Sequence, residues 1–335
     1  LQEVGGLTSS CELHSITKDH YLHVNLLQAD HARSSAARHS RSINSLEPPM
    51  PSLSSTSQSP LPLGQFATVL GGHQVHYHEV GHASAERPTL VFLHGSGPGA
   101  SGYSNFHLNF PFFADQGHHV LVPDYLGYGL SDMPTDIAYT SSMHVQMLNE
   151  LLTAKHVTQA VLVGNSLGGV IAFQYGLTYP KQIAKLVVMG PGGIEDPALW
   201  MGQMSGLACM GDFIVQRKTD RESFRELLHH IVASPETITE AVLDSRHPVW
   251  LAQPMEVFST MKVEVFGERL AELKMPVLCL WGKHDNFLPV RHALTAAQTI
   301  DNVRVVISSR SGHWFMLEEP EYFNQTLQDF LCRLP

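Results

Sequence analysis

One nine-residue stretch constrains the fold of this chain more than any other. Residues 161–169 read V-L-V-G-N-S-L-G-G, so an apolar, β-branched run ends at a glycine, a serine follows, and two glycines open an apolar run of helical length. This is the G-x-S-x-G pattern of a strand, a tight turn and a helix, in which the serine hydroxyl stands clear of the backbone. Gly164 and Gly168 leave room for the turn because neither carries a Cβ. Ser166 is therefore a candidate nucleophile, although the same pattern also occurs as a glycine-rich turn without chemistry.

The catalytic assignment depends on partners for that serine. A serine hydroxyl is barely nucleophilic at neutral pH, so it needs an imidazole base, which in turn needs a carboxylate. Where the serine lies on such a strand–turn–helix motif, called a nucleophile elbow, the three catalytic residues follow one another along the chain in the order serine, acid, histidine. Asp285 and His313 follow two late apolar runs, at the strand ends where open α/β sheets hold their sites. The sequence thus predicts a triad of Ser166, Asp285 and His313. The structural alternatives are a turn or helix-capping aspartate and a packed loop histidine.

Acyl transfer also needs backbone N–H donors for the oxyanion. One donor would be Leu167, directly after the serine, and the other Ser96, in the glycine-rich loop 94–99 that follows an apolar run. The same loop is also typical of a phosphate cradle, but no Walker lysine or ribose-binding acid accompanies it.

The order of apolar runs predicts the α/β fold class. Buried-type strands, expected at 89–93, 120–123, 161–163, 183–189, 277–281 and 303–307, alternate with helical patterns at 143–152, 291–299 and 320–331. Such alternation implies a mostly parallel, doubly wound sheet. Gly71-Gly72 indicates a hairpin between two earlier strands. Residues 196–265 hold helical patterns and no convincing strand, which predicts a helical cap inserted into a core of 63–195 and 266–335.

Residues 1–62 differ in composition from the rest of the chain. They are rich in small polar residues and proline, and cannot bury enough apolar surface to offset chain entropy. We expect a disordered tail. No continuous apolar run follows a basic start, which argues against a signal peptide, whereas an Arg- and Ser-rich transit peptide stays an alternative. Because the chain begins with Leu1, one hypothesis is that Met50 is the native start.

The bulk composition argues against several classes of function. The net charge of −10 disfavours nucleic acids and anionic membranes as partners. No apolar run approaches the roughly 18 residues that span a bilayer. The four cysteines show no C-x-x-C spacing, so we expect a cytoplasmic protein. His73, His76 and His78 are close together, but no metal-binding pattern joins them. We therefore expect neither a metal nor a cofactor.

At these residues the chain resembles the α/β-hydrolases, and within them the meta-cleavage-product hydrolases, which break carbon–carbon bonds. The resemblance covers about residues 65–333 and is carried by H-G-S-G-P-G-A-S-G-Y-S-N-F at 94–106, G-N-S-L-G-G at 164–169, G-P-G-G at 190–193 and G-H-W at 312–314. It implies the α/β-hydrolase fold with a helical cap. Leu167, Leu126 and Tyr103 stand where many members carry Met, Pro and Trp.

The resemblance also implies a small-molecule substrate, a 2-hydroxy-6-oxo-hexa-2,4-dienoate, which carries a carboxylate beside an enol. Arg246, in a cap stretch that matches the family's arginine-bearing segment, would bind this carboxylate with its planar fork. Asn105 and Asn165 would add neutral donors, and Trp314 would contact the dienoate. A solvated or salt-bridged cap arginine and a turn-forming asparagine are the alternatives for Arg246 and Asn165.

By the same resemblance, the dienol shifts to a keto tautomer, His313 mediates proton transfers, and Ser166 attacks the C6 carbonyl. Water then releases a carboxylic acid and a 2-hydroxypenta-2,4-dienoate. Which C6 substituent is accepted stays open. Members are often dimers or tetramers, so we expect a homodimer or homotetramer. A carboxylesterase with the same triad and a non-enzymatic ligand receptor are the rival functions.

Overall fold

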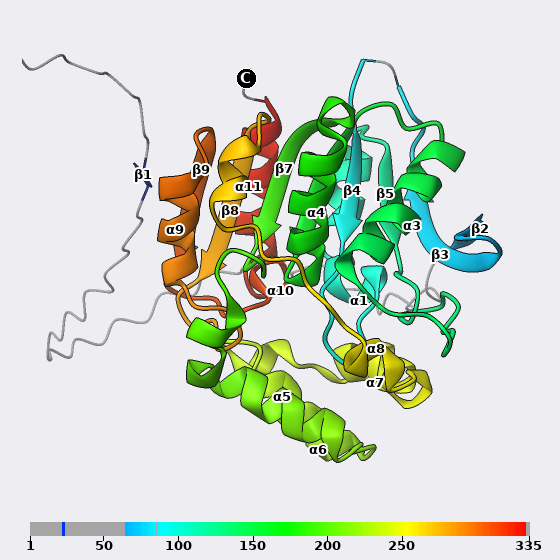
Figure 1. The fold of residues 1–335 in the computed structure, drawn as a ribbon, viewed down its shortest axis with the longest axis vertical. Coiled ribbons are helices and arrows are strands. Elements are labelled where there is room, and N and C mark those ends of the chain that lie inside the picture. The colour runs from blue at the N-terminus through cyan, green and yellow to red at the C-terminus, as the bar shows by residue number, and fades with distance from the viewer. Residues whose placement is uncertain (1–21, 24–63, 85, 333–335) are drawn as a thin grey trace, which may run out of the picture.

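The strands of the protein form one mixed sheet (Figure 1). The structure, a computed structural model, describes residues 22–23, 64–84 and 86–332. In this part of the chain the strand order is β1-β9-β8-β7-β6-β4-β5-β3-β2. The parallel core consists of β4 (Thr89–Leu93), β5 (Val120–Pro123), β6 (Ala160–Asn165), β7 (Ile183–Met189), β8 (Val277–Gly282) and β9 (Val303–Ser308).

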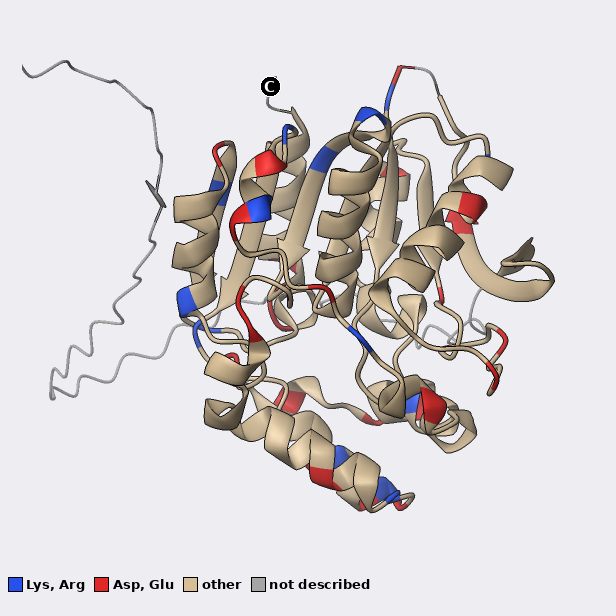
Figure 2. Ribbon diagram, in the orientation of Figure 1, with Lys and Arg blue, Asp and Glu red and all other residues tan. Residues whose placement is uncertain are grey.

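The core strands are largely apolar because helices cover both faces of the sheet. Every residue of β4, β5, β6 and β8 is buried. Figure 2 shows the same separation, since charged residues gather at helix ends, loops and the outer helices, and few lie on the central strands. The predicted α/β fold class is confirmed.

An antiparallel hairpin extends one edge of the sheet. It consists of β2 (Gln65–Val69) and β3 (His73–Val80), and β3 pairs antiparallel with β5. The predicted turn at Gly71-Gly72 lies between them, with φ of +80° and +146°. Such angles favour glycine, so this dipeptide sets the register of the hairpin.

Helices cover the two faces of the sheet. On the near face in Figure 1 lie α3 (Ser141–Ala154), capped by the Thr140 hydroxyl, and α4 (Leu167–Thr178), which is buried along most of its length. On the opposite face, the amide of Asn109 donates to Asn324 in α11. The remaining core helices are α1 (Gly102–Phe106), α2 (Phe110–Asp115), η1 (Pro180–Gln182), α9 (Arg291–Thr299), α10 (Phe315–Glu318) and α11 (Pro320–Cys332).

Between β7 and β8 the chain leaves the sheet and forms helices over the carboxyl ends of the strands (Figure 1). We call residues 196–265 the cap. The helices in and next to it are η2 (Pro197–Leu199), η3 (Met201–Gln203), α5 (Ser205–Val215), α6 (Arg221–His229), η4 (Pro235–Thr237), α7 (Glu240–Ala252), α8 (Glu256–Ser259) and η5 (Gly267–Glu272). Phe213 of α5 and Phe258 of α8 pack against Trp250 of α7, and the Arg217 guanidinium lies over the Trp250 ring, 4.3 Å from its centre.

The Arg217 side chain also caps the C-terminus of α7. Its guanidinium donates to the carbonyls of Leu251 and Gln253, which lie at the helix C-terminus and have no acceptor role inside the helix. On the outer surface, Arg221 pairs with Glu240 and Asp244, which joins α6 to α7. The cap is thus held together by one aromatic centre and by charges along its rim.

Of the tail expected at 1–62, the structure describes β1 (Leu22–His23), which pairs in parallel with Val305 and Val306 of β9. The rest of the disorder prediction, and the Met50 hypothesis, lie outside the described residues. Within the described part of the chain, every helix is too short or too polar to cross a bilayer.

Candidate active site

Ser166 occupies a strained turn between β6 and α4. Its φ of 56° and ψ of −114° lie where L-residues with a side chain are uncommon. The two flanking glycines make this turn possible. A Cβ on Gly164 would lie 2.2 Å from the carbonyl oxygen of Gly168, and one on Gly168 would lie 2.0 Å from the carbonyl oxygen of Leu93. The Ser166 N–H donates to Met189 at 2.9 Å, so β7 fixes the turn from the other side.

Asp285 and His313 meet beside this turn. The Asp285 carboxylate lies 2.8 Å from Nδ1 of His313, and both side chains are buried. Its other oxygen accepts hydrogen bonds from the N–H groups of Phe287 and Leu288, at 2.8 and 2.9 Å. Nδ1 therefore carries the proton that it donates to Asp285, which leaves Nε2 as a base. The Phe287 ring stacks on the imidazole at 5.3 Å between ring centres.

Asn165 connects the turn at Ser166 to the loop that carries His313, which we call the histidine loop. Its side-chain amide donates to the carbonyls of Met189, at 3.2 Å, and of His313, at 3.1 Å. Gly190 lies directly against the Asp285–His313 pair, since a Cβ there would be 2.8 Å from the Asp285 carboxylate. Among the described residues no hydrogen bond joins the Ser166 hydroxyl to His313. In apo enzymes such contacts are often long and tighten when substrate binds.

The glycine-rich loop lies directly against Ser166. A Cβ on Gly95 would be 3.3 Å from Cβ of Ser166. The Tyr128 hydroxyl donates to the carbonyl of Ser96, which fixes the direction of that peptide. Within the described residues, the N–H groups of Ser96 and Leu167 donate to no acceptor. Both predicted oxyanion donors are thus unused next to the serine.

His94 supports this loop from below. Its Nδ1 donates to the carbonyl of Gly95 at 2.7 Å, and its Nε2 accepts from the N–H of Tyr125 at 3.0 Å. Burial lowers the pKa of His94 to about 4, so the ring is neutral at pH 7. Apart from its place in the loop motif, no sequence pattern singled out this residue.

Arg246 is a buried cation on the underside of the cap, without a counter-ion among the described residues. It lies on α7, is only 1 % exposed, and packs over the Trp314 ring at 4.1 Å. In the described part of the chain no carboxylate lies within ion-pair distance of its guanidinium, and its Nε has no hydrogen-bond partner. Burial lowers its pKa to about 9. Within the residues that the structure describes, the side chain is therefore neither exposed to solvent nor salt-bridged.

The predicted binding residues form one connected set. Arg246 donates to the side-chain oxygen of Asn105 at 2.5 Å, and the Asn105 amide reaches the side-chain oxygen of Asn165 at 3.4 Å. Asn105 lies on α1, which starts with a capping box formed by Ser101 and Ser104. The chain of contacts therefore runs from the cap arginine to the backbone of the histidine loop.

Gln253 is a linking residue that the sequence analysis missed. It is fully buried, accepts from the N–H of Gly99 at 2.8 Å, and donates to the carbonyl of Gly127 at 2.9 Å. Gly99 itself lies under α7, because a Cβ there would be 2.2 Å from the carbonyl of Arg246. A single glutamine in a helical segment carries no sequence signal for such contacts.

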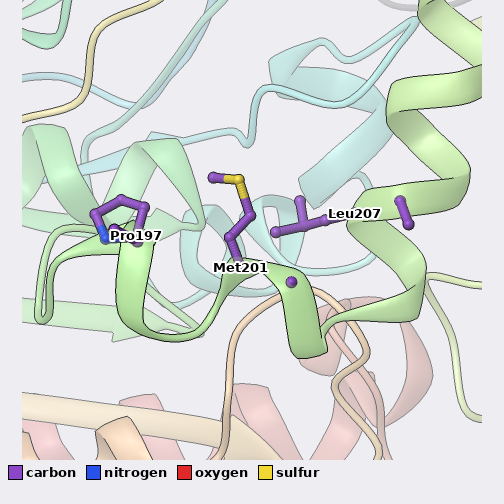
Figure 3. A pocket seen from close by; sticks show the side chains of 6 residues that line it. Pro197, Met201 and Leu207 are labelled. Atoms are coloured by element: carbon purple, nitrogen blue, oxygen red, sulfur yellow. The ribbon is translucent and has the colours of Figure 1, made fainter.

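The cap also contains an apolar pocket (Figure 3). Its volume is about 450 Å³, and it is lined by Pro197, Ala198, Met201, Gly202, Leu207 and Ala208. The neighbouring Gly206 lies against the Phe287 ring, which in turn stacks on His313. The Phe287 ring is thus packed between the start of α5, beside this pocket, and the imidazole.

The histidine cluster of β3 has other contacts. Nδ1 of His76 donates to the buried Asp124 carboxylate at 2.8 Å, and His78 stacks on Phe110. In the part of the chain that the structure describes, no group of three metal-ligating side chains is present.

Known proteins match this chain over about four fifths of its length. The α/β hydrolase fold family matches residues 88–212. The 2-hydroxy-6-oxononadienedioate/2-hydroxy-6-oxononatrienedioate hydrolase of Paraburkholderia phymatum is 35% identical, over 80% of this chain and 95% of that protein. This chain belongs to the meta-cleavage-product hydrolase family. The resemblance inferred from the motifs is confirmed.

Two further family members agree with this assignment. The 2-hydroxy-6-oxo-6-phenylhexa-2,4-dienoate hydrolase of Comamonas testosteroni is 30% identical, over 77% of this chain and 91% of that protein. The solved structure of the 2-hydroxy-6-oxo-6-phenylhexa-2,4-dienoate hydrolase of Rhodococcus sp. strain RHA1 is 26% identical. It superimposes with a TM-score of 0.69 over 79% of this chain and 98% of that one.

Proposed function

We propose that this protein hydrolyses a carbon–carbon bond of 2-hydroxy-6-oxo-hexa-2,4-dienoates, with Ser166 as nucleophile, His313 as base and Asp285 as its orienting carboxylate. The observation that carries the choice of substrate is the buried guanidinium of Arg246, which pairs with no carboxylate among the described residues. A buried charge without a partner costs free energy, so a site that keeps one is suited to an anionic ligand. The substrate carboxylate supplies that anion.

Binding positions the two ends of the substrate differently. The planar fork of Arg246 takes the carboxylate, with Asn105 beside it and the Trp314 ring against the dienoate. The C6 carbonyl then lies at Ser166, with its oxygen toward the N–H groups of Ser96 and Leu167. Each such donor is worth about 100- to 1000-fold in rate.

The reaction starts with a proton shift. The 2-hydroxyl loses its proton and C5 gains one, which gives the 2,6-dioxo tautomer, and His313 mediates this transfer. Ser166 then attacks C6 while Nε2 of His313 accepts its proton. When the C5–C6 bond breaks, its electron pair passes through the C3–C4 double bond to the C2 oxygen. The departing fragment is 2-hydroxypenta-2,4-dienoate, and one water hydrolyses the acyl-enzyme to a carboxylic acid.

The C6 substituent would point toward the cap pocket. The residues lining this pocket are uncharged, which favours an apolar substituent over one that ends in a carboxylate. The relatives differ on this point, since the Paraburkholderia protein is named for a dienedioate and the Comamonas protein for a phenyl compound. The cytoplasmic location and the homodimer or homotetramer expected from the sequence stay predictions.

The deciding experiment follows the yellow dienolate absorbance of a 6-phenyl dienoate with wild-type protein and with Ser166→Ala. We expect rapid loss of absorbance with wild type, and at least about 10,000-fold slower turnover, with ligand binding retained, in the variant. A simple aryl ester serves as the comparison substrate. A kcat/KM that strongly favours the ester would instead identify a carboxylesterase with the same triad.

A further inference from the structure

The loop that carries His313 is in direct backbone contact with the cap. The N–H of His313 donates to the carbonyl of Ile231 at 2.8 Å. A Cβ on Gly312 would lie 2.8 Å from that same oxygen and 2.9 Å from the N–H nitrogen of Ala233. The histidine loop and cap residues 231–234 therefore touch with no side chain between them.

Glu318 bridges these two segments. One oxygen of its carboxylate accepts from the N–H of Gly312 at 2.9 Å, and the other accepts from the N–H of Ala233 at 2.7 Å. Glu318 is the last residue of α10, five positions after His313. Burial raises the pKa of this carboxyl, while the bonds that it accepts from backbone N–H groups act in the opposite direction. One side chain thus satisfies a donor in the core and a donor in the cap.

A polar cavity of about 480 Å³ lies behind this bridge. It is lined by Ala233, Ser234, His284, Ser309, Arg310 and the two glutamates that end α10 and follow it. The charges around it are otherwise engaged, since Arg310 pairs with Glu319 and the His284 ring bonds to the carbonyl of Ser309. No other carboxylate of this cavity reaches both Gly312 and Ala233.

We infer that Glu318 is a positioning residue for His313: its carboxylate fixes the histidine loop to cap residues 231–234, so that the imidazole and the cap keep one relative placement. The inference rests on the proposed function, because it requires His313 to act as the base. It does not depend on the identity of the substrate. Small misplacements of a catalytic group are costly, and a shift of about 1 Å can lower a rate about 100-fold.

Two substitutions of Glu318 remove its hydrogen bonds to Gly312 and Ala233 to different extents. Glu318→Ala removes both acceptors, whereas Glu318→Gln keeps one carbonyl oxygen and turns an amide NH₂ toward the other backbone donor. Glu321→Gln, at an exposed position of α11, is the matched control. We expect kcat for the dienoate to fall about 10- to 100-fold in Glu318→Ala and less in Glu318→Gln, with KM nearly unchanged because Arg246 is untouched.

A second readout separates this inference from the proposed function. The rate at which an aryl phosphonate labels Ser166 also requires the base but no dienoate, and it should fall with kcat in the Glu318 variants. A wild-type protein that is labelled but does not cleave dienoates would remove the proposed substrate and leave this test intact. Folded Glu318→Ala, checked by thermal unfolding, that is labelled at the wild-type rate would overturn the inference.

Discussion

The two halves of the site differ in how completely their charges are satisfied. On the sheet side, Asp285 holds His313 with one oxygen and two backbone N–H groups with the other. On the cap side, Arg246 is equally buried, but among the described residues its guanidinium bonds to the neutral Asn105, packs over the Trp314 ring and pairs with no carboxylate. The charges of the sheet half are paired before any ligand binds, whereas in our proposal the substrate carboxylate completes the cap half. In the proposed function, the substrate is therefore recognised at the buried guanidinium of Arg246, whose charge no described carboxylate neutralises.

Asp285→Asn changes the sheet half of the site and has the largest expected effect on activity of the variants compared below. The amide oxygen can still accept from Phe287 and Leu288, so the fold should persist, but the imidazole loses the acceptor that fixes its tautomer. We expect kcat to fall about 10,000-fold with little change in KM, measured by dienolate absorbance. Asp301→Asn, at an exposed position, is the control. Near-wild-type turnover would show that Asp285 has only a structural role.

Arg246→Met tests the incomplete half and should separate activity from stability. We expect kcat/KM for the dienoate to fall about 100-fold and that for a neutral aryl ester to change less than about threefold. The midpoint of thermal unfolding should stay the same or rise, because replacing a buried charge by an apolar side chain is often neutral or stabilising.

The matched control for Arg246 is Arg221→Met. Arg221 is a surface arginine that is already paired with Glu240 and Asp244, so neither substrate should be affected by its loss. Equal losses on the acid and on the ester in Arg246→Met would contradict a carboxylate-binding role.

His144→Phe sharpens the comparison with a third kind of buried group, one that is polar, neutral and unpaired. Burial lowers the pKa of His144 to about 3, and its Nδ1 has no hydrogen-bond partner. The unfolded chain therefore binds a proton that the folded protein does not as pH falls from about 6.5 toward 3, and stability is lost over that range. The phenyl ring keeps the contact with Tyr125 and does not titrate.

We expect thermal unfolding of His144→Phe to shift less than that of wild type between pH 7 and pH 4.5, and activity at pH 7 to be unchanged. His94 still contributes to acid sensitivity, because burial lowers its pKa to about 4. His82→Gln, at an exposed position, should keep the wild-type shift. An identical shift in His144→Phe would mean that other groups dominate the acid response.

The sequence predicted those parts of the structure that local patterns determine. Runs such as 89–93 and 120–123 became strands with the expected bounds, because a strand covered on both faces is apolar along almost its whole length. The elbow followed from glycine spacing, since any Cβ at Gly164 or Gly168 would collide with backbone. The position of Asp285 and His313 after late strands followed from the chain order that the elbow requires.

Contacts between the cap and the core could not be predicted from the sequence. Gln253 and Glu318 each bond to segments far away in the chain, and neither belongs to a local pattern. The state of Arg246 was equally hidden, because α7 has mixed polarity and contains Pro248, and no pattern tells whether an arginine finds a carboxylate. Such features depend on how separate elements come to lie together, which one chain's residue order does not encode locally.

The backbone of Ser166 limits which atoms this scaffold can offer as a nucleophile. At a φ of 56° the side chain must leave the turn through an unbranched Cβ, since a second heavy atom there would crowd the flanking peptides. Oxygen from serine, sulfur from cysteine or a carboxylate from aspartate satisfies that requirement, and threonine does not. Evolution or design can therefore change the reacting element at this position without rebuilding the turn, but cannot add a methyl group to it.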